Sequence, residues 1–362
     1  MDRRTFLEAG LGVATATSLA GCAGQVNSRS PRAPAIVENR PNGIYLPGHV
    51  EGMQMVGTTE QGDYGFGLMY SYAHRFWNVN GETTSLTEIG PDDDIHLMAS
   101  VWDSETQTIL PETGLSVEIY RDSELISQEA IYPMLSQPMG FHYGANFGLD
   151  GDGTYDVRLS VGGLSTRRTD LFQDRFEQPT TARIPFEYSE SKRDNISFRR
   201  LEDAGSSGAV DPMAMEMLPS SIAPRADVLP GRVVGTGSTD GAVFVTTVLD
   251  SPPAGVVGQG QYLAVSARSQ YNRMVLPAMS LSAAQTRDGE ILSNQRLTRT
   301  LDPSLGYHYG AVVDAVQSGD KLTLSPTLQP QTARHEGYET AFGGETGAME
   351  DINFTVNDQQ SA

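Results

Sequence analysis

An internal repeat constrains the fold of this chain more than any other feature of its sequence. Three short segments recur without gaps at one spacing of 166 residues, as in the step from position 142 to position 308. The paired segments are 142–145 (His-Tyr-Gly-Ala) with 308–311 (His-Tyr-Gly-Ala), 109–111 (Ile-Leu-Pro) with 275–277 (Val-Leu-Pro), and 166–170 (Thr-Arg-Arg-Thr-Asp) with 332–336 (Thr-Ala-Arg-His-Glu). Three matches at one spacing indicate two tandem copies of one domain.

The segments between turn-forming residues have the patterns of short β-strands. Gly and Pro clusters separate them, and no helical periodicity is sustained. Alternating or β-branched residues mark five clear strands, at 95–102, 115–120, 155–161, 262–267 and 321–324. We therefore predict an all-β protein made of two tandem Ig-like or cupredoxin-like β-sandwiches.

Two Leu-Pro-Gly triplets indicate where the copies begin. They lie at 46–48 and 229–231, a spacing of 183 residues (46 to 229), so the first copy has extra residues near its beginning. We predict a first domain at residues 41–188 and a second at 229–362. The segment between them, 189–228, is rich in Ser, Gly, Ala and Pro and is expected to be a linker.

The first 22 residues have the features of an export signal. An arginine pair at positions 3 and 4 precedes Phe-Leu and a short apolar run at 9–20, which is typical of twin-arginine export of folded proteins and too short to span a bilayer. The run ends in Leu-Ala-Gly-Cys at 19–22, which resembles a lipobox. An ordinary signal peptide with a chance cysteine is the alternative. Cys22 is the only cysteine, so we predict its lipidation, with residues 23–40 as a flexible tether outside the membrane.

The charge of the chain excludes one class of partner and indicates its habitat. There are 45 acidic and 25 basic residues, a formal charge of −20, and only two of the basic residues are lysines, Lys192 and Lys321. Nucleic-acid binding needs a basic face, so nucleic acid is not an expected partner. An acidic, lysine-poor surface stays soluble in concentrated salt, which screens its self-repulsion. We predict a halophilic, haloarchaeal protein.

Histidine and methionine are the residues that carry candidate chemistry. There are six His and 13 Met, but no nucleophile elbow, phosphate loop or dinucleotide fingerprint. We therefore expect no enzyme, with a weak redox role on bound copper as the open alternative. Imidazole with thioether suits copper, above all Cu(I), and iron becomes suitable if oxygen ligands join.

One candidate site follows from local spacing in the first copy. His96 and Met98 are two residues apart on a predicted strand, so they share a face. Met134 and His142 flank a turn with Pro and Gly that could bring them towards that face. The alternative is a structural corner in which imidazole bonds to the backbone.

Three segments in order resemble one known family. They are 94–97 (Asp-Ile-His-Leu), 133–146 (Pro-Met, then Gly-Phe-His-Tyr-Gly-Ala-Asn) and 151–157 (Gly-Asp-Gly-Thr-Tyr-Asp-Val). They resemble the periplasmic iron-transport proteins that accompany high-affinity ferrous permeases, which are Ig-like, cupredoxin-related sandwiches that bind copper and iron. The resemblance covers about residues 48–188, and it implies that His96, Met134 and His142 are metal ligands.

Neither copy has the complete ligand set that the resemblance implies. In the first copy, Met98 stands at a glutamate position, Thr169 stands at the position of a third histidine, and Met139 could compete with Met134. The second copy has His308 and His335. Three of its other ligand positions differ, being Tyr262 for His96, Ala264 for Met98 and Thr300 for Met134. Either each copy is degenerate or the two copies share ligands across their interface, as a covalent version of the dimer that the family tends to form.

Some remaining His and Met residues have weaker indications. Three of these residues lie near the start of the first domain and could complete its site: His49, Met53 and Met55. The alternative is that they occupy ordinary surface or core positions. His74 lies in an aromatic segment predicted as a strand, where a packed histidine is expected. Three alternating methionines in the linker suggest either a copper-handling arm or an apolar strap: Met213, Met215 and Met217.

These features together predict a lipid-anchored, extracytoplasmic protein that captures copper or ferrous iron in support of iron transport. The expected metal ligands are His96, Met98, Met134, His142, His308 and His335. The expected partners are the membrane, through the lipid, and an iron permease or another envelope protein. The alternative is a metal-free Ig-like surface module for protein contact or envelope structure.

Overall fold

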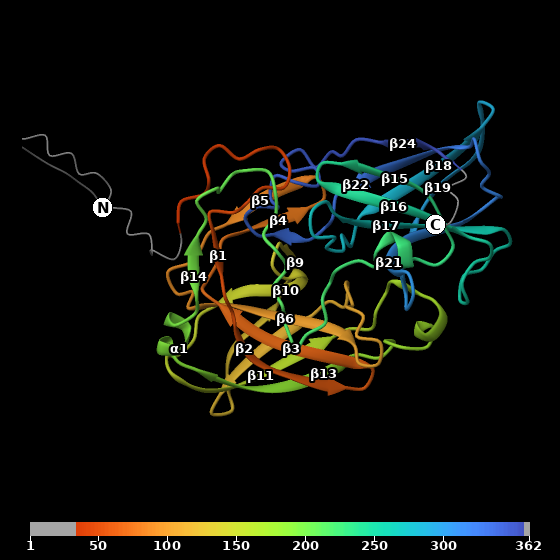
Figure 1. Cartoon of the computed structure of the whole chain (residues 1–362). Helices are drawn as coiled ribbons and strands as arrows, with labels where there is room; N and C mark the ends of the chain where they lie inside the picture. The colour runs from red at the N-terminus through yellow and green to blue at the C-terminus, as the bar shows by residue number, and fades with distance from the viewer. Residues whose placement is uncertain (1–33, 358–362) are drawn as a thin grey trace, which may run out of the picture.

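A computed structural model describes residues 34–357, so the predicted signal, Cys22 and the first part of the tether lie outside the described residues. The described chain is nearly all β, which confirms the predicted fold class. Two β-sandwich units lie side by side, the first coloured orange to green and the second green to blue (Figure 1). In the described part, no helix is long and apolar enough to cross a bilayer.

The first unit pairs an eight-stranded sheet with a four-stranded sheet. The large sheet has the order β2 (Gln54–Gln61), β3 (Tyr64–Ser71), β6 (Ile95–Asp103), β10 (Gly140–Phe147), β9 (Tyr132–Ser136), β23 (Ala333–Arg334), β4 (Phe76–Asn80), β5 (Thr83–Thr87). The small sheet has the order β13 (Thr180–Tyr188), β11 (Gly153–Val161), β7 (Ser116–Arg121), β8 (Glu124–Ala130). Burial alternates along β11 and β13, because one face of the small sheet packs on the core and the other meets water.

The second unit has a six-stranded and a four-stranded sheet. The large sheet has the order β12 (Arg167–Arg168), β20 (Thr298–Asp302), β21 (Gly306–Val313), β17 (Gln261–Ser269), β16 (Ala242–Leu249), β15 (Arg232–Thr239). The small sheet has the order β19 (Glu290–Arg296), β18 (Ser280–Arg287), β22 (Lys321–Leu328), β24 (Ile352–Thr355). In the first unit, β6, β7 and β11 coincide with the strands predicted there, and β17 and β22 do so in the second.

Several short elements complete the chain. The strands β1 (His49–Glu51) and β14 (Phe198–Arg200) form a two-stranded sheet at the edge of the first unit. The helical elements are the five-residue α1 (Glu190–Asp194) and the single 3₁₀ turns η1 (Asp170–Phe172) and η2 (Ala226–Val228). Residues 201–225 of the segment expected as a linker contain no helix or strand and run between the two units.

The two units exchange one short strand each. β12, from the first half of the chain, pairs in parallel with β20, with Arg167 opposite Thr300. β23, from the second half, pairs in parallel with β9, with Ala333 opposite Met134. β12 and β23 are 166 residues apart, as are β9 and β20. Each large sheet therefore contains a strand from the other half.

A hairpin distinguishes the two halves. Between β3 and β6 the first half contains β4 and β5, whereas the chain between β16 and β17 contains no strand. The hairpin joins the large sheet only through β23, with Arg334 opposite Trp77. These strands account for the extra residues that the sequence predicts near the beginning of the first copy.

The strand β6 is buried on both of its faces. Ile95, Leu97 and their alternate neighbours face the core between the sheets, while His96 and Met98 occupy the other face and are buried too. A strand that faced water on one side would alternate between buried and exposed residues. Other segments therefore cover this face of β6, and one covering residue, His335, comes from the second half of the chain, with its ring centroid 5.2 Å from that of His96.

Candidate metal centre

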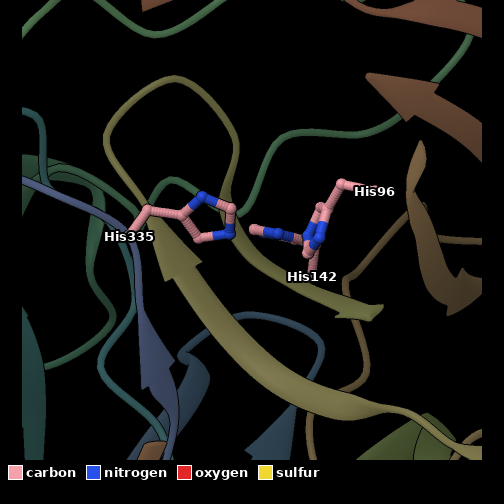
Figure 2. Close-up of side chains that lie close together, drawn as sticks. All are labelled: His96, His142 and His335. Atoms are coloured by element: carbon pink, nitrogen blue, oxygen red, sulfur yellow. The ribbon is translucent and has the colours of Figure 1, made fainter. Parts of the chain in front are cut away.

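Three imidazoles meet on the covered face of the large sheet in the first unit. His96 lies on β6, His142 lies on β10, and His335 directly follows β23. One ring nitrogen from each lies within 4.8 Å of the corresponding nitrogens of the other two. Figure 2 shows the His335 ring reaching from one side towards the rings of His96 and His142, which overlap in this view. Two of the three histidines thus come from the first half of the chain and one from the second.

Strand register explains why the first two histidines meet. On β10, the side chains of His142, Gly144 and Asn146 share one face because the strand period is two. His96 on β6 lies opposite Asn146, and Met134 on β9 lies opposite His142. Residues opposite one another in an antiparallel pair lie on the same face of the sheet. The candidate ligands of the first half therefore converge through pairing alone.

The third histidine is held by the strand that the second half contributes. Ala333 and Arg334 pair with Met134 and Leu135 on β9, which sets the position of the next residue, His335. The backbone amide of His335 also donates to the carbonyl oxygen of Leu135 at 3.0 Å. The fully buried guanidinium of Arg334 donates to the backbone carbonyl of Ala341 and to the side chain of Gln329. These contacts fix the loop that presents His335.

Hydrogen bonds orient the two strand histidines so that Nε2 faces the centre of the cluster. Nδ1 of His142 donates to the carbonyl oxygen of Gly140 at 3.0 Å. Nδ1 of His96 donates to Oδ1 of Asn146 at 2.8 Å. The Asn146 amide is itself fixed, because its nitrogen donates to the carbonyl oxygen of His74 at 2.8 Å. A proton on Nδ1 leaves a lone pair on Nε2, the arrangement that a metal-ligating histidine requires.

The Nε2 atoms of all three histidines are buried and have no hydrogen-bond partner among residues 34–357. Buried polar atoms are almost always paired, because leaving one unpaired costs about 1–3 kcal/mol. Three such atoms at one point indicate a group that the protein chain itself does not supply. The chemistry of three imidazole nitrogens fits a metal ion.

Burial also keeps these imidazoles neutral. Desolvation lowers the pKa of His96 to about 3 and that of His142 to about 4. Burial, followed by repulsion from His74, lowers the pKa of His335 well below its ordinary value. Neutral imidazole is the form that binds metals, so near neutral pH no proton competes for these nitrogens.

Met134 is the fourth donor next to the cluster. Its side chain is fully buried and packs in one cluster with Phe76 and with Ala333 of β23. A Cβ atom on Gly144 would lie 2.7 Å from Nε2 of His96 and 3.1 Å from Sδ of Met134. Glycine at this position keeps open a small space that both donor atoms border. Thioether sulfur is a soft ligand, so the donors suit a soft or borderline ion.

The structure places the other candidate methionines beside the cluster or away from it. Met98 lies opposite Gly144 on the same face, and Met139 lies in the turn before β10; both line a pocket next to His335. Met213 lines the same pocket from the linker. Met215 packs against the core and Met217 is exposed, so the three linker methionines do not share one direction. Met55 packs against the core.

His308 is not brought to the cluster. Its Nε2 atom lies 3.0 Å from the hydroxyl of Tyr262, and its Nδ1 donates to the carbonyl oxygen of Gly306 at 3.0 Å. Arg167 on the exchanged strand β12 enters the same region of the second unit. It donates to the Tyr262 hydroxyl at 2.8 Å, to the Gly310 carbonyl oxygen at 2.9 Å and to the Thr300 hydroxyl at 2.9 Å. Among the described residues, the His96–His142–His335 set is the only such group of three potential ligands.

His74 has a position that the sequence did not indicate. The predicted aromatic strand is interrupted here, because residues 72–75 lie between β3 and β4 and belong to neither strand. The His74 ring packs against His96 and His335, with ring centroids 4.7 and 5.2 Å apart. His49 pairs with Glu51, with 2.8 Å between Nε2 and Oε1. The roles of Asn146 and Arg167 also had no signal in the sequence, because both depend on pairing between distant strands.

Comparisons with known proteins match parts of the chain. Residues 227–355 match a family model described as "Domain of unknown function (DUF7350)". No curated protein sequence matches the chain. Solved structures that match include FetP of uropathogenic Escherichia coli strain F11, as isolated after expression in the periplasm (18% identity, 39% of this chain and 96% of that chain, TM-score 0.29). They also include a copper-bound FetP variant from that strain (17%, 38% and 97%, 0.28) and the copper-reconstituted P19 protein of Campylobacter jejuni (18%, 38% and 96%, 0.31).

Proposed function

We propose that this chain binds one copper ion at His96, His142 and His335, with Met134 as the fourth donor. The observation that carries the proposal is the convergence of three buried, unpartnered imidazole nitrogens within 4.8 Å. Neutral imidazoles and a buried thioether need no deprotonation to bind an ion. The site would therefore bind copper without a change in the buried charge of the ligands themselves.

The donor set favours copper over iron and zinc. Thioether sulfur selects Cu(I), whereas iron and zinc sites more often include carboxylate or thiolate. No carboxylate belongs to the three-histidine set, and Met98 replaces the glutamate that the family resemblance implies. Ferrous iron would lack the oxygen ligand that would favour it.

We infer further that the protein works outside the membrane, on a lipid at Cys22, and that copper binding supports iron transport. The support for location is the twin-arginine pattern and the lipobox-like residues 19–22. The support for the transport role is the resemblance of residues 48–188 to the iron-transport family. Partnership with a membrane permease is part of the same proposal.

Metal titration tests the copper site. We would purify the protein in molar salt and add Cu(I), Cu(II) and Fe(II) separately, measuring bound metal after removal of the excess. We expect one equivalent of copper per chain with sub-micromolar affinity, and weaker retention of Fe(II). His142→Ala should lose the copper, while its thermal unfolding without metal should show that it still folds. Absence of copper binding by the wild type, or unchanged binding by the variant, would favour the metal-free surface module.

A further inference from the structure

A pocket of about 110 Å³ lies beside the three-histidine cluster, and His335 forms part of its wall. His335 therefore borders both the cluster and the pocket. His96 and His142 do not line the pocket, so an ion in it would meet His335 first among the three. The pocket has the position of an approach to the metal centre.

Four methionines from separate segments line this pocket. Met53 follows β1, Met98 lies on β6, Met139 lies in the turn between β9 and β10, and Met213 comes from the linker. Met53 and Met213 are half-buried, whereas Met98 and Met139 are only 3% and 4% exposed. The thioethers thus extend from the outer, half-buried positions to fully buried ones.

The two carboxylates that line the pocket, Glu51 and Glu336, are already engaged, and Oε1 of Glu336 accepts a hydrogen bond from the backbone amide of Val37 at 3.3 Å. Glu51 contacts Nε2 of His49 through Oε1 at 2.8 Å and accepts a hydrogen bond from Ser71 through Oε2 at 2.9 Å. Nδ1 of His74 lies 3.8 Å from the same Oε2 atom. A hard cation that took Glu51 would have to displace these contacts, whereas a soft ion could use the thioethers directly.

We propose that the four methionines form a transit site that receives Cu(I) and passes it to the three-histidine cluster. This inference rests on the proposed copper site. The step is ligand exchange only: thioether sulfurs leave the ion as the His335 nitrogen binds it, and copper stays Cu(I) throughout. Thioethers are neutral and flexible ligands, so several can hold the ion in turn. The pocket would select for the reduced ion before the histidines bind it.

The rate of Cu(I) loading tests the transit site. The full chain would receive Cu(I) from a chromophoric Cu(I) chelator in stopped flow, and the fall in chelate absorbance would follow the transfer. The quadruple variant M53L/M98L/M139L/M213L keeps the pocket apolar and near its volume while removing every sulfur. We expect it to load Cu(I) at least tenfold more slowly than the wild type. We expect it still to bind one equivalent of Cu(II) at the wild-type rate.

Two further variants separate transit from packing. M53L/M213L alters only the two half-buried positions, which should leave the fold intact and slow Cu(I) loading at least threefold. M279L/M349L changes two methionines that pack in or against the core away from the pocket, and it should load at the wild-type rate.

The possible outcomes distinguish the two proposals. Wild-type Cu(I) rates in both pocket variants, or equal slowing of Cu(I) and Cu(II), would overturn the transit site while leaving the copper centre standing. A wild-type protein that takes up no copper would overturn the centre itself.

Discussion

His142 and His308 occupy equivalent positions in the two halves of this molecule, but different side chains surround them. Both halves place a histidine after a turn, with Nδ1 donating to a glycine carbonyl oxygen at 3.0 Å, in His142 and in His308. In the first half the opposite nitrogen has no partner, whereas in the second it meets the Tyr262 hydroxyl. One scaffold therefore supports either an open ligand set or a closed polar core, depending on the few side chains around the histidine.

Arg167 fills the space beside His308 in the second unit. Its guanidinium donates to three acceptors there and lies beside the Tyr262 ring, 5.7 Å from its centroid. Its counterpart in the first unit is Ala333, contributed by the second half of the chain, whose methyl side chain packs in one buried cluster with Met134 and Phe76 and offers no charge or hydrogen-bond donor. A fixed positive charge would also repel an incoming cation. The difference between the halves thus lies as much in the exchanged strand as in the sheet that receives it.

The largest expected effect on copper binding comes from removing His335, the ligand that the second half of the chain contributes to the first unit. His335→Ala should reduce bound copper from one equivalent to none, although residue 335 belongs to the other half of the chain from His96 and His142. His308→Ala is the matched control and should retain one equivalent, because His308 lies apart from the cluster. Metal analysis after gel filtration would measure both. Copper loss in the His308 variant alone would reverse the assignment of the two halves.

Substitutions at two equivalent glycines, Gly144 and Gly310, should have different effects, the first on copper affinity and the second on the free energy of unfolding. A Cβ at Gly144 would lie 2.7 Å from Nε2 of His96, so Gly144→Ala should weaken copper binding at least tenfold. A Cβ at Gly310 would lie 2.0 Å from the Tyr262 hydroxyl, so Gly310→Ala should instead destabilise the protein by about 1–3 kcal/mol through overpacking. Competition titrations and denaturant unfolding would test the pair. Equal copper affinity in both variants would contradict it.

Removing the arginine should destabilise the second unit without creating a metal site. Arg167→Leu removes the three hydrogen bonds that the guanidinium donates, to the Tyr262 hydroxyl, the Thr300 hydroxyl and the Gly310 carbonyl oxygen. Loss of such hydrogen bonds from a charged donor should cost about 1–3 kcal/mol, which denaturant unfolding would measure. The stoichiometry of copper should stay at one, because His308 is the single imidazole at that position. A second copper equivalent in this variant would show that Arg167 alone keeps the ion out.

The smallest effect concerns pH. Burial lowers the pKa of His308 to about 4, below the ordinary value of 6.5. Between these values the unfolded chain binds a proton that the folded chain does not, so the contribution of neutral His308 is present above pH 6.5 and declines as the pH falls towards 4. The decline is about 1.4 kcal/mol per pH unit at most. His308→Gln should therefore lose less stability than the wild type between pH 7 and pH 5 in denaturant unfolding; identical pH profiles would contradict the shift.

Local patterns in the sequence predict only part of this site. The strand period places His96 and Met98 on one face, and the turn at 138–140 brings Met134 opposite His142, as the register confirms. The contribution of His335 to the site of the first copy was one of two alternatives that the sequence left open. The sequence could not decide between them, because the position of His335 depends on β23, a two-residue strand with no pattern of its own. The same limit applies to Arg167 on β12. Contacts made through such short strands are decided by the packing of the whole molecule.

The exchange of β12 and β23 has a consequence for how this protein can change over time. In a symmetric dimer of identical chains, one substitution alters both sites at once, so neither can be given up without losing the other. Here the two halves belong to one chain, and a mutation in one leaves the other as it was. The second half supplies His335 to the first unit, and the first half supplies Arg167 to the second unit. The two equivalent positions can therefore hold different side chains, one set suited to a ligand and the other to a closed polar core.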